Sequence, residues 1–190
     1  TGSYFMSGNS LGGVLSLYAS EAISKRKESF PSNFGGVAVM NPAVGVDPRA
    51  VPSAFIVQCL TILAFIAPKA QVSLTPFEDA TGYACPPDST RNFNGHWPLS
   101  TSKMCLDVTS KRVKNDIQDG NILLDTVDRV LVISGEEDEV VPFSAIKEFY
   151  DHIKPGQKEL LSIPGFGHDM MSHDKATTVV LQTLLDWMKK

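Results

Sequence analysis

Three loops of this 190-residue chain carry the side chains that together make a serine reactive. Ser10 lies in the sequence GNSLGG, Asp138 in GEEDEVVP, and His168 at the end of GFGH. A serine hydroxyl is a poor nucleophile near neutral pH, so it needs a base that takes its proton and a carboxylate that orients the base. We therefore expect Ser10 to be a nucleophile, His168 its base and Asp138 the acid. The amide of Leu11, directly after the serine, is expected to stabilise the oxyanion that such an attack produces.

The residues on either side of Ser10 predict how the serine is presented. An apolar segment, residues 4–6, precedes it, and a helical pattern, residues 14–19, follows it. A strand, the pattern Gly-x-Ser-x-Gly and a helix in this order form a nucleophile elbow, a strained turn that exposes the serine at the carboxyl end of the strand. The first amides of the helix then point toward the same place. An ordinary glycine turn is the alternative interpretation of this motif.

Both the acid and the base have competitors nearby in the chain. Glu136 and Glu137 share the acidic loop with Asp138, and either could supply the carboxylate instead. His173 follows His168 by five residues, and we expect it at the N-terminus of a helix. His168 is favoured because it alone among the four histidines lies in a loop of small residues just after a predicted strand.

The apolar patterns along the chain predict an α/β fold. Short apolar runs indicate strands at residues 4–7, 37–40, 130–134 and 160–163, and helical patterns cover about 11–27, 143–153 and 174–190. Strands that alternate with helices form a parallel, doubly wound sheet with right-handed crossovers. Functional groups of such sheets gather at the carboxyl ends of the strands, which is where all three candidate residues fall.

The middle of the chain interrupts this alternation and predicts an inserted cap. We expect core residues at 1–46 and 127–190, with the insertion at 47–126. Residues 51–68 are almost entirely apolar and have prolines at both ends. We expect a cap helix that can contact a lipid surface, with a buried helix and a membrane span as alternatives. Its side chains Ile62 and Phe65 are expected to bind the apolar part of a substrate.

Composition and charge exclude several other classes of function. Lys and Arg number 17 against 21 Asp and Glu, giving a net charge of −4 without a basic cluster, so we expect no nucleic-acid partner. The three cysteines, at positions 59, 85 and 105, lack C-x-x-C spacing, which favours free thiols in a reducing compartment over one disulfide and a free thiol. Together with the apolar cap helix, this gives an expected cytoplasmic or peripheral-membrane location. No His or Cys cluster has metal-ligand spacing and no loop fits a dinucleotide, so no metal or organic cofactor is implied.

The three loops resemble the catalytic blocks of serine hydrolases of the α/β-hydrolase fold. NPA at residues 41–43 and the apolar helix ending in IAPKAQVSLTP are similar to the monoacylglycerol lipase and lysophospholipase group, also called serine aminopeptidase S33-like hydrolases. The resemblance implies hydrolysis of carboxylic esters such as monoacylglycerols or lysophospholipids through an acyl-enzyme. Two alternatives stay open: a catalytically silent hydrolase-like subunit or interaction module, and a peptidase or thioesterase of the same fold.

The resemblance extends over only the C-terminal half of the family's domain. The family's His-Gly oxyanion motif has no match here, and the strand at residues 4–6 would need a partner strand from the same or another chain. We predict that residues 1–190 expressed alone aggregate or fold poorly, with esterase activity at least about a hundredfold below that of the complete domain. Size-exclusion chromatography and an ester assay test this, and a monomeric, fully active 190-residue protein would contradict it.

Overall fold

The computed structural model describes residues 2–26, 33–47, 49, 51–73, 96–119, 124–154 and 156–190. These residues divide into two compact units. The first unit comprises Thr1–Ala50 together with Thr109–Lys190, and the second comprises Val51–Val108. The second unit therefore interrupts the first in sequence, as the predicted insertion does.

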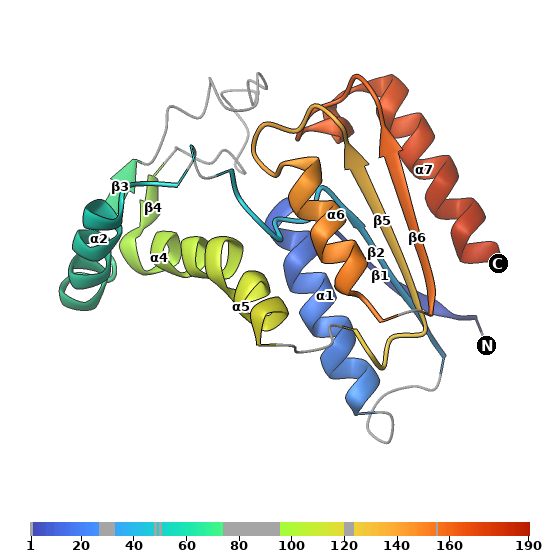
Figure 1. The fold of residues 1–190 in the computed structure, drawn as a ribbon, viewed down its shortest axis with the longest axis horizontal. Helices are drawn as coiled ribbons and strands as arrows, with labels where there is room; N and C mark the ends of the chain where they lie inside the picture. The colour runs from blue at the N-terminus through green and yellow to red at the C-terminus, as the bar shows by residue number, and fades with distance from the viewer. Residues whose placement is uncertain are drawn as a thin grey trace. The chain divides into compact units, whose positions relative to one another are not determined.

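The first unit is built on a four-stranded parallel sheet (Figure 1). Its strands are β1 (Tyr4–Asn9), β2 (Phe34–Met40), β5 (Arg129–Gly135) and β6 (Gln157–Ile163), in the order β1-β2-β5-β6. Its principal helices are α1 (Ser10–Lys25), α6 (Phe143–His152) and α7 (Asp174–Lys189). The α/β class and the parallel sheet are thereby confirmed. In the described part of the chain β1 pairs only with β2, so it forms one edge of the sheet.

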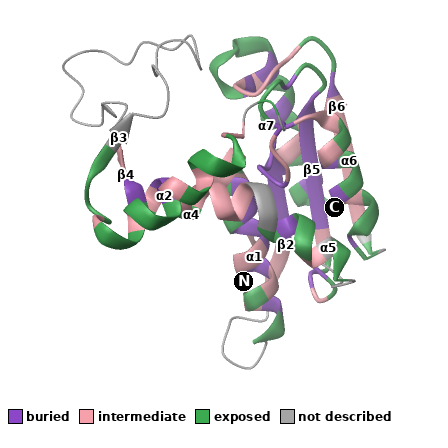
Figure 2. Cartoon of the chain, turned by 60° about the vertical axis from the view of Figure 1, so that its left-hand side comes forward, coloured by how far each residue is buried: buried purple, intermediate pink, exposed green. Residues whose placement is uncertain are grey.

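Helices cover both faces of this sheet, with α1 and α6 on one side and α7 on the other (Figure 1). Successive side chains of a strand point to opposite faces, so neighbouring residues of β2 serve different cores. Ala38 and Met40 belong to the core that includes Val180 and Trp187 of α7. Buried residues are concentrated in β2 and β5 (Figure 2), which explains why these strands read as continuous apolar runs.

Residues 109–118 group with the first unit, so the inserted unit is shorter than the predicted 47–126. They form most of a π-helical turn (Val108–Arg112) and all of helix α5 (Val113–Gln118). The hydroxyl of Tyr18 on α1 donates to Asp116 at 2.6 Å, and the Arg112 guanidinium lies 4.7 Å from the centre of the Tyr18 ring. Burial and this hydrogen bond raise the pKa of Tyr18 above its ordinary value. These contacts connect the π-helical turn and α5 to α1, the helix that begins at Ser10.

The inserted unit contains helix α2 (Ala54–Ile66), strands β3 (Gln71–Ser73) and β4 (His96–Pro98), and helix α4 (Leu99–Asp107). The two strands pair antiparallel, and α2 contacts α4. Residues 74–95 of the predicted insertion lie outside the described residues. Helix α2 exposes large apolar side chains: Phe55, Ile56, Ile62, Leu63, Phe65 and Ile66. No helix among the described residues has the length and apolar character needed to cross a membrane.

Strand β1 and helix α1 approach each other closely at Gly8. A Cβ atom at this position would lie 2.3 Å from the carbonyl oxygen of Gly12 and 2.6 Å from Oγ of Ser16. Real Cβ atoms do not approach backbone oxygens so closely, so a larger residue would push strand and helix apart. A Cβ at Gly12 would by contrast meet no heavy atom within 4 Å beyond its own helix backbone and chain neighbours.

This difference predicts opposite effects for two neighbouring substitutions. Gly8→Ala should lower the free energy of unfolding by about 1–3 kcal/mol, because the clash is with backbone that cannot move away. Gly12→Ala should be neutral or stabilising by about 0.5–1 kcal/mol, because alanine favours a helix over glycine. Urea unfolding of the complete protein, followed by circular dichroism, measures both. Equal effects of the two substitutions would contradict the close packing at Gly8.

Candidate active site

Ser10 occupies the sharp turn between β1 and α1. Its φ angle is +52°, in the left-handed region that residues other than glycine rarely adopt. The carbonyl of Ser10 accepts a hydrogen bond from the amide of Ala43 at 3.0 Å, so the loop after β2 holds the turn from the neighbouring strand. The geometry is that of the predicted elbow: strand, strained serine and helix follow one another without a gap.

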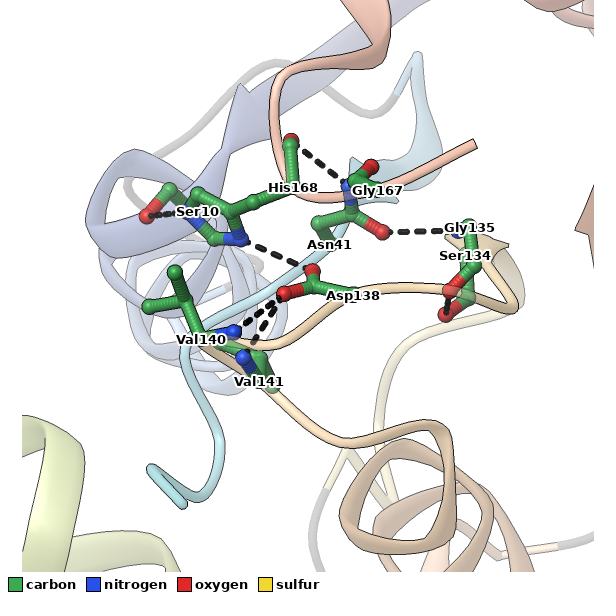
Figure 3. Close-up of polar contacts among 9 residues, drawn as sticks. All are labelled: Ser10, Asn41, Ser134, Gly135, Asp138, Val140, Val141, Gly167 and His168. Carbon is green, nitrogen blue, oxygen red and sulfur yellow. Dashed lines mark hydrogen bonds and ion pairs between the residues drawn. The ribbon is translucent and has the colours of Figure 1, made fainter. Parts of the chain in front are cut away.

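Ser10, His168 and Asp138 form one hydrogen-bonded line (Figure 3). Nε2 of His168 lies 2.8 Å from Oγ of Ser10, and Nδ1 lies 2.8 Å from Oδ2 of Asp138. An ionised carboxylate only accepts, so Nδ1 carries the proton and Nε2 is left to accept from the serine hydroxyl. Ser10 begins α1 directly after β1, whereas Asp138 and His168 come from the loops after β5 and β6, and their proximity is as the strand-end positions predict.

The structure selects Asp138 among the clustered acidic residues. Its side chain is 0% exposed, and its Oδ1 accepts the amides of Val140 and Val141, each at 2.8 Å. Glu136 and Glu137, the two alternatives considered from the sequence, are exposed. The hydrogen bonds from these two amides replace the hydrogen bonds with water that the Asp138 carboxylate loses when it is buried.

The acid loop and the base loop are also joined by their backbones. The amide of Glu136 donates to the Ile163 carbonyl at 3.1 Å, and the amide of Glu137 donates to the Phe166 carbonyl at 3.0 Å. A Cβ at Gly135 would lie 2.3 Å from the Phe166 carbonyl oxygen, so only glycine allows the two loops to approach this closely. The distance between acid and base is therefore set by main-chain contacts.

The sequence analysis missed the part that Asn41 has in this site. From the sequence, Asn41 was noted only as part of NPA at residues 41–43, yet its buried side chain hydrogen-bonds Gly135, Gly167 and His168 (Figure 3). Its φ angle is +38°, also in the left-handed region. An asparagine between a buried strand and a proline was the available signal, because asparagine tolerates this conformation better than most residues.

The other residues named from the sequence lie as follows. Leu11 is the second residue of α1, directly after Ser10, and is partly buried. His173 precedes α7, is exposed, and has its ring 5.8 Å from that of Phe166. Ile62 and Phe65 lie on α2 of the inserted unit, 54% and 88% exposed. Among the described residues, no group of three or more His, Cys, Asp and Glu is arranged to hold a metal ion.

Comparison with known families identifies the chain. A family model described as serine aminopeptidase, S33, matches residues 1–176. The chain belongs to this family. No curated protein matches the sequence.

Solved structures of α/β-hydrolases share this S33 chain's fold. A monoacylglycerol lipase from Paleococcus ferrophilus is 16% identical with a TM-score of 0.71, and the match covers 98% of this chain and 68% of that one. A soluble variant of monoglyceride lipase from Saccharomyces cerevisiae, in complex with a substrate analogue, is 18% identical with a TM-score of 0.75, covering 98% and 62%. Mouse alpha/beta hydrolase domain-containing protein 10 is 18% identical with a TM-score of 0.60, covering 100% and 63%. The chain thus spans about two thirds of their length.

The geometry predicts a large effect for Asp138→Asn with little loss of structure. The amide oxygen can keep the hydrogen bonds from Val140 and Val141, so its NH₂ group faces Nδ1 of His168. Nδ1 must then accept, the proton moves to Nε2, and His168 can no longer accept from Ser10. We expect the rate at which a fluorophosphonate probe labels Ser10 to fall about 10³–10⁴-fold, at an unfolding temperature close to that of the wild type.

Glu137→Gln provides the matched control, since Glu137 lies in the same loop and is exposed. Its labelling rate should stay near that of the wild type. Similar losses in both variants would mean that the loop as a whole, and not the carboxylate of Asp138, supports the reactivity of the serine.

Proposed function

We propose that this S33-family protein is a serine hydrolase acting on carboxylic esters, with Ser10 as nucleophile, His168 as base and Asp138 as acid. The observation that carries the proposal is the continuous hydrogen-bonded line from Ser10 through His168 to a fully buried Asp138, with both links at 2.8 Å. A serine held only for structural reasons would not need a neutral imidazole acceptor that is itself oriented by a buried carboxylate.

The reaction would proceed in two halves. Oγ of Ser10 attacks the ester carbonyl carbon while Nε2 of His168 takes the hydroxyl proton, and the tetrahedral intermediate collapses when His168 returns that proton to the leaving alcohol. Water then attacks the acyl-enzyme, again losing a proton to His168, which passes it to Oγ of Ser10 as the carboxylic acid leaves. Nδ1 of His168 keeps its proton throughout and donates it in a hydrogen bond to Asp138, whose negative charge stabilises the imidazolium.

We assign one oxyanion donor to the amide of Leu11. The first amides of a helix have no acceptor within the helix, and Leu11 is the second residue of α1. The positive end of the helix dipole lies at the same place, so negative charge on the former carbonyl oxygen is stabilised there.

For the substrate we propose an ester with an apolar acyl chain, such as a monoacylglycerol or a lysophospholipid. Helix α2 supports this, because its exposed apolar side chains include Ile62 and Phe65, which suit an acyl chain better than a peptide. We further propose that the same side chains contact a lipid surface, from which such substrates are taken. The two monoglyceride lipases that share the fold are described as acting on this kind of molecule.

Ser10→Ala tests the proposed reaction directly. Turnover of p-nitrophenyl butyrate by the complete protein should fall by about 10⁴-fold or more, because the variant lacks the hydroxyl that would form the acyl-enzyme. Ser7→Ala replaces an exposed serine of β1, the strand that precedes Ser10, and should retain full activity. Turnover that survives in Ser10→Ala would identify a different nucleophile. Faster cleavage of aminoacyl p-nitroanilides than of esters by the wild type would favour a peptidase.

Charged substitutions on α2 test the proposed substrate class. Phe65→Asp and Ile62→Asp should lower turnover of a long-chain ester at least about tenfold more than turnover of the butyrate, and should weaken sedimentation with phosphatidylcholine vesicles. Gln58→Asp adds the same charge at an exposed polar position of α2 and serves as the control. Equal losses on long and short esters would show that α2 supports the fold and does not bind the acyl chain.

A further inference from the structure

Asn41 lies at the end of β2, and the proposed reaction has no direct use for it. The residue is 0% exposed, and the neighbouring loops surround its side chain (Figure 3). A buried amide is costly unless all its polar atoms are hydrogen-bonded, and a left-handed backbone adds strain. A residue that combines burial, polarity and strain at a functional edge calls for an explanation.

Every polar atom of the Asn41 side chain has a partner. Its Oδ1 accepts from the amide of Gly135 at 2.9 Å. Its Nδ2 donates to the carbonyl of Gly167 at 3.1 Å and to that of His168 at 2.7 Å. One N–H donor and two carbonyl acceptors require an oxygen and an NH₂ group at fixed places, and this arrangement suits an amide but not a carboxylate or a hydroxyl.

The partners of Asn41 belong to both loops that deliver the acid and the base. Gly135 is the last residue of β5, directly before the loop that carries Asp138, and the carbonyl of His168 belongs to the base itself. The main chain of Asn41 continues the connection, since its amide donates to Ile133 of β5 at 2.8 Å. Two residues later the amide of Ala43 holds the carbonyl of Ser10 at 3.0 Å. The segment 41–43 therefore hydrogen-bonds the backbone of Ser10, that of His168, and that of Gly135, three residues before Asp138.

We infer that Asn41 is a positioning residue, which holds the backbone of His168 so that its imidazole reaches Ser10 and Asp138 together. This inference rests on the proposed function. The hydrogen bond to the His168 carbonyl limits rotation and displacement of the residue that transfers the proton, and the bond to Gly135 ties the acid loop to the same amide. Asn41 touches none of the reacting side chains, so it acts only through the residues that it holds.

Asn41→Ala in the complete protein removes all three side-chain hydrogen bonds. The rate of fluorophosphonate labelling and kcat for p-nitrophenyl butyrate should each fall about 10²-fold per active site, the size of effect that a displacement of about 1 Å produces. KM should change less than about twofold, because Asn41 does not face the ester. Rates are expressed per serine that becomes labelled at completion, so unfolded protein does not contribute.

Asn41→Gly is the second variant, because glycine adopts the left-handed backbone without strain and keeps the protein folded where alanine does not. It should lose the same hydrogen bonds and the same rate. Ser134→Ala is the matched control: Ser134 is also 0% exposed at the end of β5, but its hydroxyl donates to Gly135 and not to the base loop. It should lower stability while leaving the rate per labelled serine within about twofold of the wild type.

The outcomes separate this inference from the proposed function. A wild-type protein in which the probe does not label Ser10 overturns the proposed function, and the inference with it. A labelled wild type whose Asn41 variants keep the wild-type rate per labelled serine overturns the inference alone and leaves Asn41 a structural residue. Rates that fall in both Asn41 variants while Ser134→Ala stays close to the wild type support it.

Discussion

The left-handed turn at Ser10 is the constraint around which this site is assembled. A φ angle of +52° is unfavourable for serine, and it persists only because the surroundings determine it from several sides. Gly8 allows strand and helix to meet without a clash, and the amide of Ala43 holds the serine carbonyl from the next strand. The main-chain contacts of the neighbouring segments thus hold the strained backbone of Ser10. Its hydroxyl is not needed for this and hydrogen-bonds His168.

Burial is greatest at the acid end of the hydrogen-bonded line. Ser10 is partly exposed, the His168 side chain is 24% exposed, and the Asp138 side chain is fully buried. The Asp138 carboxylate is shielded from water, which strengthens its interaction with the imidazole. The amides of Val140 and Val141 offset the cost of burying the carboxylate, because they donate hydrogen bonds to Oδ1 of Asp138, the oxygen that does not bind His168.

The two units differ in the kind of side chain that they present. The first unit holds the polar, hydrogen-bonded residues at the carboxyl edge of its sheet, and the second exposes the apolar side chains of α2. The boundary on the C-terminal side lies in the π-helical turn that ends at Arg112, next to the contact of Tyr18 with Asp116. That contact depends on α1, far away in sequence, so the helical pattern of residues 109–118 could not show which unit they join.

The sequence alone determined the main elements of the sheet and the three candidate residues, because buried strands need apolar runs and a nucleophile elbow needs small residues around the serine. It missed the first half of β6, where Lys158 and Glu159 pair with Val130 and Leu131, because strand pairing uses backbone atoms that any side chain permits. Only the tertiary structure decided that Asp138 and not Glu136 or Glu137 faces the histidine. It also gave Asn41 its place among the loops, because such hydrogen bonds depend on distances between segments more than 90 residues apart.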